Sequence, residues 1–284
     1  MAMDDSILAP LDGTGPAEAG LRWAQQAAEV CRAPLRLLTV VSPDGSGEGA
    51  TVAAAEEYLR SQREAVEEDG LLASTEVVVG EPAECILDRA TEAGLTVMTY
   101  GTSRWLVGAA LDFVLRNMKR PVLVVRAHPN HTGAARPGGA KVLVPLDRST
   151  SSDRVLAEAR RLAKTLSASI VLCHIVEPVG MFLNPQDVPP GIASVIEDEM
   201  GKARSFLSDV AMAFQREGEA VETVVAMGEP PHEIVRIAER AGAGVIAMAT
   251  RGAGSLSRIM GSVAYAVLLS GRLPCLLVRP NDTD

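Results

Sequence analysis

The chain contains two copies of one sequence pattern. Residues 7–12 read Ile-Leu-Ala-Pro-Leu-Asp, and residues 142–147 read Val-Leu-Val-Pro-Leu-Asp. Near the end of each half, Pro-Val-Leu-Val-Val-Arg at 121–126 returns as Pro-Cys-Leu-Leu-Val-Arg at 274–279. A repeat of about 140 residues has the length of a whole domain, which excludes a solenoid element. The chain is therefore predicted to hold two domains of one fold, and the differences between them become clues to function.

Each half alternates short β-branched apolar runs with stretches of helical period that are rich in Ala, Glu and Arg. This alternation predicts an α/β fold in which helices cover a parallel sheet. We expect a doubly wound, Rossmann-like domain of five strands and four helices in each half. The expected strands are 6–11, 35–41, 75–79, 95–100 and 121–125, then 141–146, 169–176, 220–226, 244–248 and 274–278. The expected helices are 16–32, 51–69, 82–93 and 106–117, then 153–166, 191–217, 231–241 and 256–270.

A Pro- and Gly-rich segment, residues 128–139, separates the halves. Such a composition is typical of an exposed linker, so the domains are predicted at 1–127 and 140–284. His128 and His131 lie in this segment without a third ligand, which favours solvated linker over a metal site.

Composition excludes several functional classes. The net charge is −9 and only 3% of residues are aromatic, so neither an attractive field nor stacking platforms favour nucleic acid. Acidic residues precede the first apolar run, and the most apolar helical stretch, 259–269, is too short to span a bilayer. We therefore expect a cytoplasmic protein with no membrane segment. Cys31, Cys85, Cys173 and Cys275 are scattered in apolar runs, which predicts buried reduced thiols.

The copies differ in length at two places. The offset between matched residues is 135 at Asp12 and Asp147, 148 at Gly80 and Gly228, and 153 at Pro121 and Pro274. Most of the extra length is assigned to a Pro-rich segment at 177–190. Three further residues follow the fourth strand of the second half, because the offset is 150 at Met98 and Met248 and 153 at Pro121 and Pro274. Loops there lie at the carboxyl ends of the strands, where open α/β sheets bind ligands.

The second of these places holds a glycine-rich loop. Residues 248–262 read Met-Ala-Thr-Arg-Gly-Ala-Gly-Ser-Leu-Ser-Arg-Ile-Met-Gly-Ser and lead into an apolar helical run. Gly252, Gly254, Gly261 and Ser262 would let phosphate oxygens approach backbone N–H groups at a helix start. The same residue types also form ordinary loops and caps, so this pattern alone leaves both readings open.

Asp12 and Asp147 each follow a first strand, at the same edge as that loop. A carboxylate there can accept a hydrogen bond from a ribose hydroxyl or an adenine amine. The alternative is an N-cap for the next helix, with Pro10 and Pro145 ending the strands. Several hydroxyl residues after Asp147 can also cap, so both interpretations stay open.

Together these motifs resemble the universal stress protein family. The resemblance rests on the Pro-x-Asp strand ends, the Gly-Glu-Pro turns at 80–82 and 228–230, the glycine loop, and the closing Pro-x-Leu-x-Val-Arg strands. It covers nearly the whole chain as two tandem domains. It implies that the two domains pair as a pseudo-dimer through their last strands, and that two chains can pair again as a homodimer.

The ATP-binding branch of that family carries Gly-x-x-Gly, nine residues, then Gly-Ser or Gly-Thr. The second half is similar, except that Ala249 replaces the first Gly and eight residues separate Gly252 from Gly261. The resemblance implies an ATP site, with or without Mg²⁺, in the second domain. Its residues would be Pro145, Asp147, Ile175, Met248, Ala249, Arg251, Gly252, Gly261, Ser262 and Val263. His174 is interpreted as a packed strand residue.

The first half departs further from that pattern. Only six residues separate Gly101 from Gly108, Ala109 replaces the hydroxyl residue, and Trp105 stands inside the loop. We expect no ATP site there. No P-loop Gly-Lys-Ser/Thr ending, Ser-His-Asp set or metal cluster is evident, which favours a nucleotide-gated stress or signalling module over an enzyme. The alternatives are a scaffold that binds no nucleotide and a slow ATPase.

Overall fold

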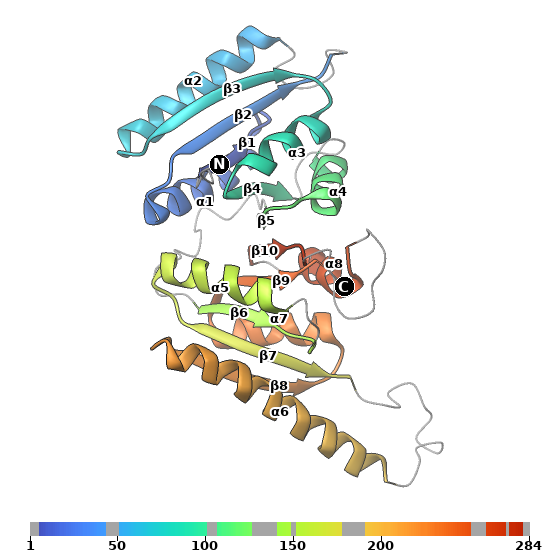
Figure 1. Ribbon diagram of the computed structural model, residues 1–284. Coiled ribbons are helices and arrows are strands. Elements are labelled where there is room, and N and C mark those ends of the chain that lie inside the picture. Colours follow the sequence, from blue (N-terminus) through green and yellow to red (C-terminus); the bar gives the residue numbers. More distant parts are fainter. Residues whose placement is uncertain are drawn as a thin grey trace. The chain divides into compact units, whose positions relative to one another are not determined.

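The computed structural model describes residues 6–43, 51–100, 107–126, 141–148, 152–177, 191–250, 260–270 and 273–280. The chain divides into two compact units (Figure 1). The first unit comprises residues 1–137, 256–260 and 272–279, and the second comprises 138–255, 261–271 and 280–284. The predicted linker 128–139 lies outside the described residues.

The first unit is a doubly wound α/β sheet. Its elements are β1 (Ile7–Pro10), α1 (Gly15–Cys31), β2 (Leu35–Val41), α2 (Val52–Glu68), β3 (Ala73–Val79), α3 (Pro82–Glu92), β4 (Leu95–Tyr100), α4 (Val107–Asn117) and β5 (Val122–Arg126). The strand order is β3-β2-β1-β4-β5, with every pair parallel. Helices α1 and α2 cover one face of the sheet, and α3 and α4 pack together on the other (Figure 1).

The last strand of the chain, β10 (Cys275–Val278), also belongs to the first unit. It pairs antiparallel with β5, and Leu276 lies opposite Leu123. The edge of β5 is thereby covered by the segment that the resemblance expects there. A sheet edge left bare would expose a row of unpaired N–H and C=O groups.

The second unit repeats this plan. Its elements are β6 (Lys141–Pro145), α5 (Ser152–Leu166), β7 (Ile170–Val176), α6 (Ile192–Arg216), β8 (Val221–Met227), α7 (Pro230–Ala241), β9 (Ala243–Ala249) and α8 (Ser262–Ser270). The strands lie in the order β9-β6-β7-β8 and pair in parallel. The α/β class, the parallel pairing of β1–β5 and of β6–β9, and most element positions were predicted from the sequence. The strand expected in the second half at 274–278 is β10, which pairs antiparallel with β5 in the first unit.

Two local expectations were wrong. The last helix was expected from residue 256, but α8 begins at Ser262, and Met260 and Gly261 are not helical. Cys31 and Cys85 were expected to be buried, but Cys31 is exposed at the end of α1 and Cys85 is half-buried. Cys173 and Cys275 are buried as predicted, and burial raises the pKa of each thiol to about 12.

Buried aliphatic side chains form the core of each unit. Leu8, Leu37 and Leu59 are fully buried in the first unit, as are Leu143, Leu172 and Leu207 in the second. Burying a side chain of this size contributes roughly 1.5–3 kcal/mol. Within the described ranges, no helix is both long and apolar enough to cross a bilayer.

Helix α6 is the main difference in element length between the units. It has 25 residues, whereas its counterpart α2 has 17. Their last residues, Glu68 and Arg216, are separated by the same 148-residue offset as Gly80 and Gly228. The eight additional residues therefore lie at the start of α6, at 192–199, and we call this segment the α6 extension. The expectation that most of the extra length lies at 177–190 was wrong, because the larger part of the rise in offset from 135 to 148 is helical.

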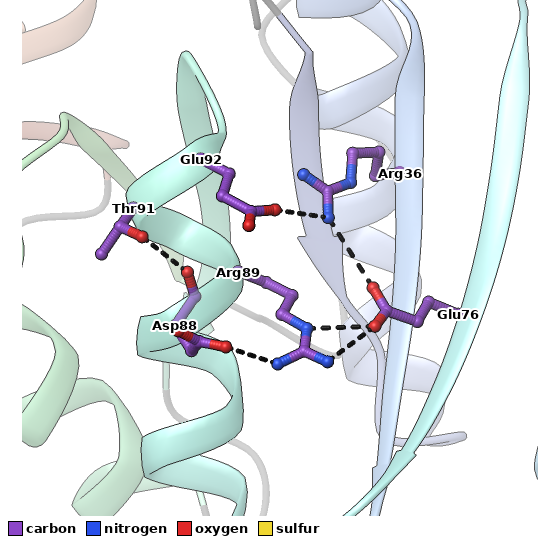
Figure 2. Close-up of polar contacts among 6 residues, drawn as sticks. All are labelled: Arg36, Glu76, Asp88, Arg89, Thr91 and Glu92. Atoms are coloured by element: carbon purple, nitrogen blue, oxygen red, sulfur yellow. Dashed lines mark hydrogen bonds and ion pairs between the residues drawn. The ribbon is translucent and has the colours of Figure 1, made fainter.

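An ion-pair network attaches α3 to the sheet of the first unit (Figure 2). The Arg89 guanidinium donates to Glu76 Oε1 from Nε at 3.0 Å and from a terminal nitrogen at 2.9 Å. Arg36 lies 3.7 Å from the other Glu76 oxygen and 3.4 Å from Glu92. The hydrogen bond to Glu76 raises the pKa of Arg89 above its usual range. Glu76 is thus the carboxylate that both arginines share.

The second unit has apolar residues at the equivalent positions of this network. By the offsets of 135 and 148, Arg36, Glu76 and Arg89 correspond to Val171, Val224 and Ile237. Val171 and Ile237 are buried. The two copies therefore make the same helix–sheet contact with different chemistry.

This difference gives a stability prediction. Glu76→Val should destabilise the first unit by about 1 kcal/mol, because two partly exposed arginines lose their shared carboxylate. Adding Arg36→Val and Arg89→Ile should recover that loss, since apolar residues can replace an ion-pair set at no net cost. Urea unfolding, followed by amide exchange in α3, measures both variants. A triple variant less stable than Glu76→Val would contradict the prediction.

Candidate functional site

The carboxyl end of β6 presents the Asp147 turn, residues 146–148. Pro145 is half-buried and lies opposite Cys173 of β7. Leu146 is buried, and its N–H donates to the Cys173 carbonyl at 2.8 Å, which extends the ladder by one bond. Asp147 and Arg148 then turn outward, and both are exposed. The strand thus delivers Asp147 to the carboxyl edge of the sheet, as the sequence predicted.

His174 holds this turn from the neighbouring strand. Its Nδ1 lies 2.6 Å from the Leu146 carbonyl oxygen, so Nδ1 carries the proton and donates it. The ring is buried and meets Phe206 of α6 edge-on, with ring centroids 6.1 Å apart. His174 is therefore packed within the strand layer, which agrees with the prediction.

The first unit makes the same support with a different side chain. Thr39 Oγ1 donates to the Leu11 carbonyl at 3.0 Å. Thr39 and His174 share the 135-residue offset of Asp12 and Asp147. No sequence pattern predicted this pair of supports, although the shared offset places the two residues at equivalent positions.

The carboxyl end of β9 leads into the helix that follows the glycine loop. Met248 is buried, Ala249 is half-buried and Thr250 is 2% exposed. The Thr250 carbonyl accepts from Gly261 N–H at 2.6 Å, which joins the two ends of the loop. Arg251 and Gly252 lie outside the described residues, as do Trp105 and the excursion at 178–190.

Gly261 caps helix α8. Its carbonyl accepts from Tyr265 N–H at 3.0 Å, which is the first turn of the helix. The N–H groups of the first helical residues, Ser262 and Val263, have no acceptor within the helix, as at any helix start. The first turn of α8 contains no acidic residue. This helix end is therefore suited to an anion such as phosphate.

The Asp147 turn and the end of β9 follow neighbouring strands. Between these strands the connections of the sheet change direction. Strand β6 lies between β7 and β9, and Leu143 is paired with Ile246. Continuing that register places Pro145 beside Met248. Ile175 is half-buried near the end of β7, which runs three residues beyond Cys173. Open α/β sheets bind ligands at such a switch point, outside the carboxyl ends of the strands.

Asp12 has a local role in the first unit. Its Oδ1 accepts from Thr14 N–H at 3.0 Å and from the Thr14 hydroxyl at 2.6 Å. Thr14 is the N-cap residue of α1. Asp12 is therefore not itself the N-cap that the alternative expected, and its carboxylate instead binds the N-cap residue.

Arg148 makes a contact that no sequence pattern predicted. One of its terminal nitrogens lies 3.2 Å from Glu199 Oε2 on α6. Hydrogen bonds from Lys202 and Arg148 hold the pKa of Glu199 below its usual range. No cluster of three or more potential metal ligands occurs among the residues that the structure describes.

Comparison with known proteins gives this architecture a family. The model of the universal stress protein family matches residues 3–126 and again 140–279. The chain belongs to this family. The match to two segments confirms the tandem arrangement that the sequence motifs indicated.

Individual relatives agree over nearly the whole chain. A universal stress protein of Mycolicibacterium smegmatis is 25% identical, with 99% of each chain covered. Universal stress protein Rv2623 of Mycobacterium tuberculosis is also 25% identical, over 98% of this chain and 97% of its own. The crystal structure of a universal stress protein from Archaeoglobus fulgidus superimposes with a TM-score of 0.71. It is 21% identical and covers 97% of this chain and 98% of its own, which supports the shared fold.

Proposed function

We propose that this universal stress protein binds ATP through its second unit and acts as a nucleotide-gated module in stress response or signalling. The observation that carries the proposal is the meeting of the Asp147 turn with the start of α8 at the switch point beside β6. A carboxylate that accepts from the nucleoside end and helix N–H groups that donate to phosphates together complement an adenine nucleotide.

Each residue has a proposed place in that site. Asp147 accepts from the ribose or adenine, while Ile175 and Met248 border the base. Pro145 and Ala249 end the strands beside the ligand. Gly252, Gly261, Ser262 and Val263 line the phosphates, with the backbone N–H groups of Ser262 and Val263 donating to phosphate oxygens, and Arg251 adds positive charge. Mg²⁺ would be held by the phosphates themselves, since hard cations prefer oxygen ligands.

The proposal also covers the setting of the protein. It works in the cytoplasm, its two domains form a pseudo-dimer, and two chains associate as a homodimer. Binding, not turnover, is its activity. A hydrolysis rate above about one per second, near the low end for enzymes, would instead assign it as an ATPase.

Calorimetric titration with ATP, ADP, AMP and GTP tests this function. The expected result is saturable binding of adenine nucleotides, tighter for ATP than for AMP because the start of α8 engages more than one phosphate. Equal affinity for ATP and AMP would remove the phosphate role of α8. Failure of every nucleotide to bind at millimolar concentration would favour the scaffold alternative.

A further inference from the structure

Arg148 adopts a backbone conformation that is unfavourable for residues with a side chain. Its φ is 65°, in the left-handed region. This conformation costs about 1–2 kcal/mol for a residue with a Cβ, whereas glycine adopts it freely. The equivalent position in the first unit is Gly13, with φ of 79°. Both copies thus make the same turn, and the second places a long cationic side chain in it.

The side chain of Arg148 contacts the α6 extension. Glu199, which accepts from Arg148, is the last residue of that segment. Glu199 also accepts from Lys202 Nζ at 2.8 Å, and Lys202 lies 2.7 Å from Asp198. Because Lys202 serves the helix alone, the Arg148 contact is the one that leaves the helix and reaches the sheet edge.

The extension has little other anchorage among the described residues. No residue from 192 to 202 is buried, Val195 is 49% exposed, and Ala203 is the first buried residue of the helix. Segments with few buried contacts open at low free-energy cost. The order of the extension should therefore respond to even a modest ion pair.

Among the residues described before and within α2, the first unit has no counterpart of this contact. Gly13 has no side chain, and α2 begins at Val52, the counterpart of Met200. The pair therefore occurs only in the unit to which the ATP site is assigned. Arg148 directly follows Asp147, so any change in the Asp147 turn moves the backbone that carries this guanidinium.

We propose that Arg148 is a positioning residue that couples the Asp147 turn to the α6 extension through Glu199. Ordering of the turn then favours ordering of the extension. The reverse also applies, because the coupling free energy between two linked equilibria acts equally in both directions. The inference rests on the proposed function only for the identity of the ligand. With ATP in the site, the Asp147 turn is fixed, and the extension reports occupancy at the surface of the second unit.

Hydrogen exchange of the full chain, read by mass spectrometry, tests the coupling. Without nucleotide, Arg148→Gly should speed exchange at 192–199 by about two- to fivefold, the range that exposed ion pairs support. Glu199→Gln should speed exchange both there and in peptides that cover the Asp147 turn. Lys202→Gln is the matched control: it removes the other partner of Glu199, so it should leave exchange in the turn unchanged. The charge-exchanged double variant, Arg148→Glu with Glu199→Arg, should restore protection.

The same experiment is then repeated with MgATP. Wild-type chain should gain protection in the turn and at 192–199, whereas Glu199→Gln should gain it in the turn alone. The inference would be overturned if wild type, Arg148→Gly and Glu199→Gln exchanged at the same rate at 192–199 and also at the same rate in the turn. The arm without nucleotide decides this by itself. Absence of any MgATP effect on the wild-type second unit would instead count against the proposed ATP site.

Discussion

Replacing Asp147 by alanine is expected to weaken ATP binding by roughly 10- to 100-fold. A charge-assisted hydrogen bond contributes about 1.5–3 kcal/mol, and this carboxylate lies at the switch point of the second unit. Asp147 is exposed at the end of a strand, so its removal should leave the fold of that unit intact. Titration calorimetry measures the affinity, and circular dichroism checks the fold.

Asp12→Ala is the matched control for this prediction, because Asp12 is the same residue of the other copy. Its carboxylate binds the Thr14 N–H and hydroxyl, so its loss should cost about 1 kcal/mol of stability in the first unit. ATP affinity should not change. The two variants therefore have opposite signatures, and a loss of affinity in Asp12→Ala as large as that in Asp147→Ala would contradict the assignment.

Gly228→Ala is expected to destabilise the second unit by about 3 kcal/mol. Gly228 has φ of 152°, and a Cβ on it would lie 2.8 Å from Glu233 Cγ. Both the backbone strain and the overlap oppose the change. Glu233 cannot move aside cheaply, because it is buried and its carboxylate is paired with Arg236 at two nitrogens.

Gly201→Ala provides the opposite result from the same chemical change. Gly201 lies inside α6, and a Cβ there would meet nothing within 4 Å. Alanine should stabilise this exposed helix position by about 0.5–1 kcal/mol. Urea unfolding, followed by exchange of amides in β8 and α7, separates the second unit from the first. Equal stability of the Gly228→Ala and Gly201→Ala variants would show that the contact with Glu233 is not restrictive.

Much of the fold was predictable because local pattern and tertiary structure agree. The alternating apolar runs of 35–41 and 95–100 became β2 and β4 with their predicted bounds. Duplication helped further, because each element had to be consistent with its counterpart. Pro82 begins α3 as predicted, whereas α7 begins at Pro230, one residue before its predicted start. Proline suits both helix starts because no N–H partner is needed there.

The remainder depended on contacts between residues far apart in the sequence. Glu76 is shared by Arg36 and Arg89, which lie on two different elements, and no local pattern connects them. Helix α8 was predicted too early because the apolar spacing before Ser262 resembles a helix, whereas Gly261 caps it. The left-handed φ of Arg148 was likewise invisible in a stretch with no glycine, although its alignment with Gly13 contained the signal.

The candidate site was predictable in part for the same reason. Asp147, Met248 and Ser262 follow or flank predicted elements whose ends must meet at one edge of a parallel sheet. Two contacts with the Asp147 turn were not predicted. His174 donates to the Leu146 carbonyl, and Glu199 of the α6 extension accepts from Arg148. Such roles depend on three-dimensional packing, which single-sequence patterns do not encode.

The most direct test is the number of adenine nucleotides bound to each 284-residue chain, counted by native mass spectrometry after incubation with ATP and Mg²⁺. We predict one nucleotide per chain for the wild type and for Asp12→Ala, and a clearly lower occupancy for Asp147→Ala at the same ATP concentration. Two nucleotides per chain would contradict the restriction of binding to the second unit. None, at millimolar ATP, would contradict nucleotide binding itself.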